Sequence, residues 1–247
     1  MYSSPDIKSL PKLGSRMGSS VWLCRDFESG DYLTLKVFTC RRVAGVTAQS
    51  TNEMTAARHI QDTEYEHPSD RYLRLILRNF AIYGLGGEHR RLLYTCQGMT
   101  FMEFRSLLPN RLLNKALLQQ TYQLILIGLD LLHQLGVVHT DISPNNILLG
   151  AQSSSVFSKI EKAELEHPSS CKALKNRVIY QSQSMPITDG TPVLCGMEWD
   201  YKIGIWSIGV MIWDLFEGGR PFYALKKRIL DGEQHLAEMV ALMGPSP

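Results

Sequence analysis

The segment from Val138 to Leu149, VHTDISPNNILL, constrains the fold more than any other part of the chain. It places Asp141 two residues after His139 and Asn146 five residues after that aspartate, and the apolar triplet Ile-Leu-Leu follows directly. Turn chemistry accounts for Asp, Ser, Pro and Asn, but it does not predict a triplet that is typical of a buried strand. Phosphoryl transfer needs a carboxylate that accepts a hydroxyl proton and a nearby amide oxygen that holds Mg²⁺. The spacing therefore favours a phosphotransferase loop over a plain turn.

Three weaker features precede this loop in a fixed order. A glycine-rich stretch, LGSRMGSSVWL, begins at Leu13 and is typical of a hairpin that covers a nucleotide. An alternating strand over residues 32–37 carries a single lysine, Lys36, and the helical stretch 51–60 carries Glu53. In a nucleotide site, Lys36 would contact the α- and β-phosphates and Glu53 would pair with the lysine. Each feature is common alone, and it is their order and spacing that indicate the function.

With these motifs the chain resembles the eukaryotic protein kinases, and among them the SR-protein kinase-like enzymes of fungi. The resemblance begins at about Leu13 and covers almost the whole chain, and it also rests on HTDISPNNIL, WDYKIGIWSIGVMIWDLFEG and HLAEMVALMGPSP. It implies an α+β fold of two lobes. Residues 1–98 would form a small antiparallel sheet with one helix, and residues 99–247 a larger, mainly helical lobe that is incomplete. It also implies ATP and Mg²⁺ as cofactors and Ser or Thr hydroxyls of proteins as substrates. Only the likeness to SR-protein kinases points to Ser/Arg-rich substrates.

The resemblance assigns roles to individual residues. The catalytic residues would be Asp141, Asn146, Lys36 and Ser143, with Asn146 also a metal ligand. The nucleotide would be bound by the glycine-rich hairpin, by the lysine with its glutamate, and by the connection between the lobes: Gly14, Gly18, Ser19, Val21, Lys36, Glu53, Gln97 and Met99. In that connection, the backbone groups of Gln97, Gly98 and Met99 would hydrogen-bond the base.

Several positions depart from the family pattern. Arg16 replaces the second glycine of the hairpin, where a side chain obstructs close approach of the backbone to phosphate, although a guanidinium can itself pair with phosphate. Ser143 stands where the family usually has lysine, and a neutral hydroxyl stabilises the transferring phosphate less. Gly204 replaces an aspartate that ties the catalytic loop to the central helix, and it weakens that helix by about 1 kcal/mol relative to alanine.

The largest departure falls between Cys195 and Gly196. The family's second Mg²⁺ ligand is the aspartate of an Asp-Phe-Gly motif, expected just after a strand over residues 191–195. Neither Asp-Phe-Gly nor the Ala-Pro-Glu that ends an activation segment occurs in this sequence. Asp189 precedes the strand and is predicted to lie in a turn, and Asp200 is predicted to be a polar residue at a helix start. Loss of this ligand and of the platform for peptide substrate predicts inefficient turnover, while weak nucleotide binding could survive.

Hydrophobic periodicity places the remaining elements. Short alternating segments predict strands over residues 20–25, 75–83 and 91–96 in the first lobe. A helix is predicted over 114–135 and ended by Gly136, and a second over 203–216, which is apolar on all sides and would be the buried central helix. Residues 151–190 are polar, rich in serine and low in periodicity, so they are predicted to form a loop insertion at the surface.

Composition narrows the partners. The net charge is +2, and with no basic stripe the sequence gives no reason to expect direct nucleic-acid binding. The apolar run 203–216 is too short and too interrupted for a membrane span, so no membrane partner is expected. The 5 cysteines are odd in number and widely spaced, which favours reduced thiols over disulfides or a zinc site. The start of the chain has no apolar core of a secretory signal, and a cytoplasmic or nuclear location, or both, is expected.

Three functions stay open at this point. The first is a serine/threonine protein kinase whose sequence lacks an internal segment, through splicing or a faulty gene prediction. The second is a pseudokinase, which keeps the fold and recruits partners without catalysis. The third is a small-molecule phosphotransferase of the aminoglycoside-kinase kind, which shares the His-x-Asp-x-x-x-x-Asn loop. The SR-kinase-like final segment argues against the third.

Overall fold

The computed structural model describes residues 7–16, 18–39, 46–67, 72–84, 87–175, 177–188, 192–194, 201–219, 221–222, 225–226, 229–230 and 232–243. The predicted positions Asp189, Cys195, Gly196 and Asp200 lie outside these residues.

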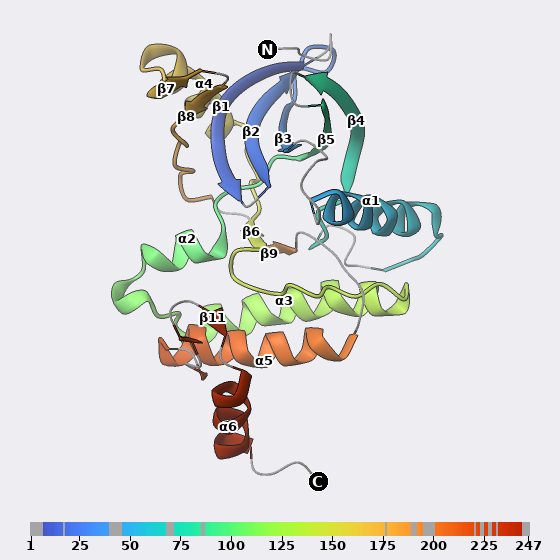
Figure 1. The fold of residues 1–247 in the computed structure, drawn as a ribbon, viewed down its shortest axis with the longest axis vertical. Coiled ribbons are helices and arrows are strands. Elements are labelled where there is room, and N and C mark those ends of the chain that lie inside the picture. Colours follow the sequence, from blue (N-terminus) through green and yellow to red (C-terminus); the bar gives the residue numbers. More distant parts are fainter. Residues whose placement is uncertain are drawn as a thin grey trace.

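The first part of the chain forms a five-stranded antiparallel sheet in the order β1-β2-β3-β5-β4. Its strands are β1 (Ile7–Arg16), β2 (Ser19–Asp26), β3 (Tyr32–Phe38), β4 (Ile76–Gly84) and β5 (Gly87–Thr95). Helix α1 (Val46–Asp62) lies between β3 and β4 in the chain and flanks the sheet (Figure 1). The predicted sheet lobe with one inserted helix is confirmed.

Alternation along the strands gives the sheet two apolar faces. On one face, Phe38, Leu92 and Tyr94 pack with Ala57 of α1. Lys36 lies on this same face, because its cross-strand partner is Leu92. Residues of the opposite parity on the same strands form a separate cluster: Cys24, Leu33, Leu35 and Leu93.

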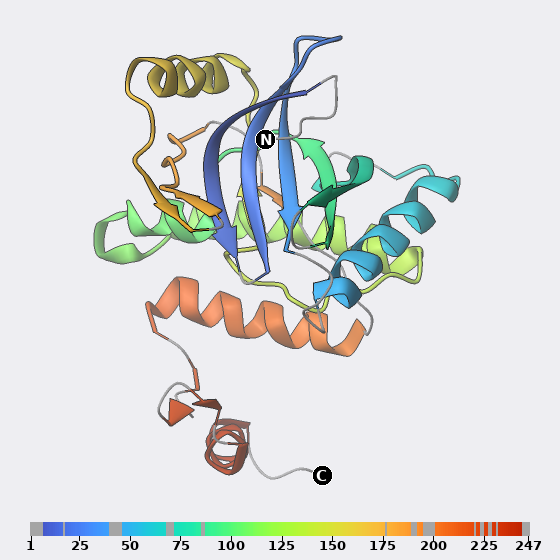
Figure 2. The same ribbon diagram turned by 45° about the horizontal axis from the view of Figure 1, so that its top comes forward.

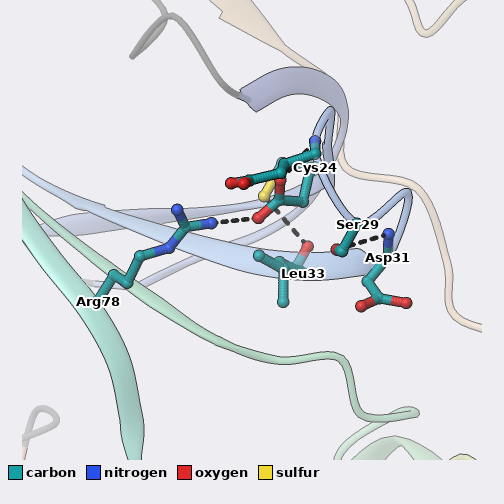
Figure 3. Close-up of polar contacts among 7 residues, drawn as sticks. Cys24, Ser29, Asp31, Leu33 and Arg78 are labelled. Atoms are coloured by element: carbon teal, nitrogen blue, oxygen red, sulfur yellow. Dashed lines mark hydrogen bonds and ion pairs between the residues drawn. The ribbon is translucent and has the colours of Figure 1, made fainter.

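The connection between β2 and β3 is held by short polar contacts (Figure 3). The Cys24 thiol donates to the Leu33 carbonyl at 3.3 Å, and the Asp31 backbone N–H donates to the Ser29 hydroxyl at 3.2 Å. Burial raises the pKa of the Cys24 thiol to about 12, so this thiol stays protonated at physiological pH.

A carboxylate at the end of β2 anchors the same turn. Asp26 accepts from the Glu28 backbone N–H at 2.9 Å and is ion-paired with Arg78 of β4. The Glu28 hydrogen bond is the largest influence on the pKa of Asp26, and together with Arg78 it outweighs burial and lowers that pKa. The turn is therefore stabilised by an ionised carboxylate.

The second lobe is mainly helical. It contains α2 (Phe101–Ser106), a short 3₁₀ helix (Pro109–Arg111), α3 (Lys115–Gln134), α5 (Tyr201–Glu217) and α6 (Gly232–Met243). This lobe also has two small antiparallel sheets. In one, β6 (Ile147–Leu149) pairs with β9 (Pro192–Leu194) across the intervening insertion, and the other is the hairpin of β10 (Leu225–Lys226) and β11 (Ile229–Leu230). The core runs through α3 and α5 and includes Ile125, Leu129, Leu132 and Leu215.

Local chemistry sets the ends of these helices. The Asn114 side chain accepts from the Leu117 N–H at 2.9 Å and caps α3, and Gly136 takes a left-handed φ of 67° just after it.

Between helices, the Arg105 guanidinium of α2 donates to the Asp214 carboxylate of α5 at 2.7 Å. This pair fixes α2 against α5. The prediction that this helix is buried on all sides was wrong, because the Trp213 and Phe216 side chains are 44% and 51% exposed.

The prediction that the surface insertion over residues 151–190 is a loop was wrong. This insertion contains helix α4 (Ser155–Glu166) and a hairpin of β7 (Cys171–Leu174) and β8 (Arg177–Tyr180). The helix buries one stripe, Phe157, Ile160 and Glu161, among serines, lysines and other glutamates. The helix is only 12 residues long and lies in a stretch rich in serine and charged residues, a composition typical of loops, which is why the sequence pattern favoured a loop. Within the described residues, the helices are all too short or too polar to cross a membrane.

Candidate nucleotide site

The glycine-rich stretch forms the predicted hairpin, with β1 and β2 as its arms. Gly14 pairs with Val21 across the strands, and Gly18 in the turn has a φ of 82°, a left-handed conformation that favours glycine. The Gly18 carbonyl accepts from the Thr39 N–H at 2.8 Å, which ties the hairpin tip to the end of β3. Next to the turn, Ser19 is buried.

Lys36 and Glu53 lie together, as the sequence predicted. Lys36 is opposite Val21 in the β2–β3 ladder, so it lies beside the second arm of the hairpin. Its ammonium donates to Glu53 Oε2 at 2.7 Å, and the Glu53 side chain is buried. Because a buried carboxylate must be paired, this contact fixes α1 relative to β3. An ammonium held in this way suits the binding of phosphate oxygens, although the nucleotide role of both residues stays a prediction.

Sequence reasoning missed a third member of this cluster, Tyr94. Its hydroxyl donates to Glu53 Oε1 at 2.5 Å, so both oxygens of the carboxylate are engaged. The Arg74 guanidinium lies over the Tyr94 ring, 4.7 Å from its centroid. The strand register places Tyr94 opposite Thr34, two residues from Lys36 and on the same face. Knowledge of that register could have identified Tyr94. The sequence of β5 does not reveal the register, because this strand is buried on both faces and shows no alternation.

The catalytic-loop residues also lie together. The Asn146 side-chain nitrogen donates to the Asp141 carbonyl at 2.8 Å and to Asp141 Oδ2 at 2.6 Å. A turn closes the loop between them, in which the Asn146 N–H donates to the Ser143 carbonyl at 2.8 Å. The Pro144 carbonyl accepts from the Met102 N–H at 3.1 Å, which attaches the loop to α2. Asp141 is exposed, as a residue that meets a substrate hydroxyl must be, whereas Asn146 is buried.

The predicted base-binding connection is partly engaged elsewhere. The Gly98 N–H donates to the Leu149 carbonyl at 2.6 Å, and the Met99 carbonyl accepts from the Leu149 N–H at 2.9 Å. The Met99 side chain is buried in the helical core. A side chain at residue 98 would meet Thr188 Oγ1 at 2.1 Å, so glycine is required there. These two backbone groups already pair with β6, so a base would have to use other backbone groups of this connection, such as those of Gln97.

Helix α4 of the insertion flanks the face of the sheet that carries Lys36, at the opposite end from α1. Phe157 and Ile160 of α4 pack with the fully buried Leu23 of β2. The Tyr32 hydroxyl donates to Glu161 Oε2 at 2.6 Å, and burial together with that carboxylate raises the pKa of the Tyr32 phenol. Because Leu23 pairs with Thr34, it shares the face that carries Lys36.

The return segment of the insertion binds the glycine-rich hairpin. The Gln183 N–H donates to the Lys12 carbonyl of β1 at 2.7 Å, and the Trp22 ring of β2 meets the Tyr180 ring edge-on at 5.5 Å. Cys96, just after β5, packs against the cluster of Leu23, Phe157 and Ile160 instead, and burial raises the pKa of its thiol to about 11. Figures 1 and 2 show the insertion on the β1 side of the sheet and α1 on the β4 side. This second flank was not predicted from the sequence.

The residues present fit ATP and Mg²⁺ in part. Lys36 supplies a phosphate-binding cation, and since the Asn146 side-chain nitrogen donates to Asp141, its amide oxygen is the group suited to a metal ion. Among the described residues, no group of three or more His, Cys, Asp or Glu side chains could hold a metal. Asn146 is thus a candidate for one ligand of the pair that the resemblance implies, and its metal role stays a prediction.

The fold has two lobes, with a lysine–glutamate pair in the sheet lobe and an Asp/Asn loop in the helical lobe. This combination defines the class of two-lobed phosphotransferases. The chain belongs to the protein kinase domain family, whose sequence model matches residues 7–243.

Individual relatives agree with this membership. A serine/threonine protein kinase of Aspergillus fumigatus is 28% identical over 272 residues, which cover 96% of this chain and 65% of the relative. The serine/threonine-protein kinase SRPK of Physarum polycephalum is 26% identical over 302 residues, covering 100% of this chain and 68% of the relative. The chain thus spans 65% of the length of the Aspergillus relative. A crystal structure of a kinase domain shares the fold with a TM-score of 0.70 and 18% identity, covering 100% of this chain and 73% of that one.

Proposed function

We propose that this chain binds ATP between its two lobes and is a serine/threonine protein kinase of low catalytic rate. The observation that supports this is the pair of contacts Lys36–Glu53 at 2.7 Å and Asn146–Asp141 at 2.6 Å. One pair lies in the sheet lobe and the other in the helical lobe, which is how phosphotransferases of this family divide the work. Protein kinase domains use ATP and Mg²⁺, and we extend this to the present chain.

In this proposal each residue has a separate task. Lys36 binds the α- and β-phosphates and Glu53 holds the ammonium in place. Asp141 accepts the proton of the attacking Ser or Thr hydroxyl, and the Asn146 amide oxygen binds the metal. Mg²⁺, when bound, neutralises charge on the phosphate oxygens. Ser143 would donate a hydrogen bond to the transferring phosphate in place of the usual lysine, which stabilises the developing charge less.

The hairpin and the lobe connection would complete the nucleotide site. Val21 would cover the base, Gly14, Gly18 and Ser19 would lie along the phosphates, and the Gln97 backbone would contact the base. Met99, buried in the core, would support that contact rather than make it. The substrate would be a protein, and Ser/Arg-rich sequences are the first to try because of the SRPK relative. Action in the cytoplasm or nucleus belongs to the same proposal.

A pseudokinase is the second candidate, favoured by one specific observation. The sequence lacks the Asp-Phe-Gly aspartate and the activation segment that the family uses for the second metal contact and for peptide binding. Losing a charged contact to the transferring phosphate costs on the order of 10²–10³ in rate. A chain of this kind binds nucleotide and recruits partners without measurable transfer.

The experiment compares four proteins: the wild type, Lys36→Ala, Asp141→Asn and the control Lys159→Ala, which removes an exposed lysine of α4. Calorimetric titration with ATP, with and without Mg²⁺, should show affinity lost by about tenfold or more in Lys36→Ala only. Phosphate transfer to a Ser-Arg repeat peptide should be weak in the wild type and absent in Asp141→Asn.

Each alternative has its own outcome. Equal ATP affinity in Lys36→Ala and Lys159→Ala would refute the site. ATP binding with peptide transfer no greater than in Asp141→Asn would establish the pseudokinase. Turnover only with small hydroxylated compounds would favour a small-molecule phosphotransferase.

A further inference from the structure

Tyr94 lies on the face of the sheet that packs against α1. It is almost fully buried, with 4% of its surface exposed, and it sits near the end of β5. Its hydroxyl donates to Glu53 Oε1 while Lys36 donates to Glu53 Oε2. One carboxylate of α1 is therefore held from two sides, by the ammonium of β3 and by the phenol of β5.

The ring of Tyr94 is held in turn by Arg74. The guanidinium lies 4.7 Å from the ring centroid and donates to the Thr95 carbonyl at 3.0 Å. The Arg74 backbone N–H donates to the Leu194 carbonyl of β9 at 2.9 Å. These contacts join α1, β5 and β9 through residues about which the motifs of the sequence say nothing.

We propose that Tyr94 is a positioning residue, whose hydroxyl keeps Glu53 directed at Lys36 and so keeps the ammonium ready for phosphate. This inference rests on the proposed nucleotide-binding function. The Lys36–Glu53 contact joins β3 to α1 through two side chains. A single ion pair leaves the carboxylate group free to rotate about the bond that joins it to the side chain. A second donor at the other oxygen removes that freedom. Preorganisation of this kind stabilises a charged ligand because the site need not reorder on binding.

The test removes only the phenol oxygen. Tyr94→Phe keeps the ring under Arg74, and Tyr83→Phe, at a side chain that is 77% exposed in β4, is the matched control. ATP with Mg²⁺ is the probe. We expect Tyr94→Phe to weaken ATP binding by between about 3- and 30-fold, since hydrogen bonds to a charged group are the stronger ones. Tyr83→Phe should bind as the wild type does.

A double-mutant cycle separates positioning from a general loss of structure. If Tyr94 acts through Glu53, then in a Glu53→Ala background, which has no acceptor for the Tyr94 hydroxyl, Tyr94→Phe should change ATP affinity by less than about twofold. An equal loss in both backgrounds would overturn the proposal, because it would show that Tyr94 acts independently of the carboxylate.

Amide hydrogen exchange of α1 without nucleotide provides a readout that does not depend on ATP. We expect the α1 amides near Glu53 to exchange at least about threefold faster in Tyr94→Phe than in Tyr83→Phe. Unchanged exchange would overturn the proposal, even if the wild type binds no ATP. A wild type without ATP affinity but with faster α1 exchange in Tyr94→Phe would instead refute the proposed function alone. If Tyr94→Phe does not fold, Glu53→Ala removes the same hydrogen bond from the other side, and unchanged α1 exchange there is also contrary to the proposal.

Discussion

Replacing Phe157 by alanine tests whether the insertion is part of the folded core. Phe157 lies on α4, is 4% exposed, and packs with Leu23 and Ile160. Its ring centroid is 5.9 Å from that of Tyr32 on the sheet. Truncating a buried phenylalanine costs about 3–5 kcal/mol of unfolding free energy in a closed core. Because α4 lies at the surface and can settle into the space, we expect about 2–4 kcal/mol.

Urea unfolding followed by circular dichroism measures this loss. With a slope of about 1–3 kcal/mol per molar, the midpoint should fall by roughly 1 M or more, in a transition of unchanged slope. Leu165→Ala, at a side chain of the same helix that is 66% exposed, is the control and should change the free energy by less than about 0.5 kcal/mol. If Phe157→Ala and Leu165→Ala unfold at the same urea concentration, α4 does not dock on the sheet and the reasoning is refuted.

Three further predictions concern other contacts. The pKa of Asp26 is lowered in the folded protein, so its contribution to stability is present at pH values above the ordinary pKa of about 3.9 and is lost as the pH falls through the lower folded pKa. Asp26→Asn should therefore lower the free energy of unfolding at pH 7 but cost little near pH 2. An equal cost at both pH values would contradict this. Iodoacetamide at pH 8 should modify the exposed Cys171 at least about tenfold faster than Cys96, whose pKa of about 11 keeps it a thiol, as peptide mass spectrometry would show; faster labelling of Cys96 would refute its burial. Arg105→Ala leaves the Asp214 carboxylate without its guanidinium and should cost about 2–4 kcal/mol in urea unfolding, whereas a loss below about 0.5 kcal/mol would contradict the packing of α2 on α5.

The regular elements could be predicted because each carries its own local signal. Strand β3 covers the predicted strand 32–37 and one further residue, and α3 begins one residue after the Asn114 cap and ends close to Gly136. These patterns depend on residues that are near one another in sequence, so one sequence suffices to find them. The membership in the kinase family follows from the same kind of local signal, namely motifs in a fixed order.

The contacts that join distant segments could not be predicted. Tyr94 and Glu53 are 41 residues apart, and Tyr32 and Glu161 are 129 apart, so their pairing depends on strand register and on how α4 docks. A strand such as β5, where Leu92, Leu93 and Tyr94 are all buried, has no alternation to show which side chain faces the site. The roles assigned to Asp141, Asn146 and Ser143 stay predictions until nucleotide binding is measured.

The position of the insertion has a consequence for how molecules of this protein behave toward one another. Strand β1 is at the edge of the sheet, and an edge strand with open backbone groups is a template on which another chain can add a strand. The Gln183 N–H occupies the Lys12 carbonyl of β1, and the Lys12 ammonium reaches the Tyr180 carbonyl at 3.3 Å. Along this part of β1 the chain covers its own edge. The insertion whose helix α4 flanks the nucleotide face thus also protects the protein, through its return segment, from strand-by-strand aggregation.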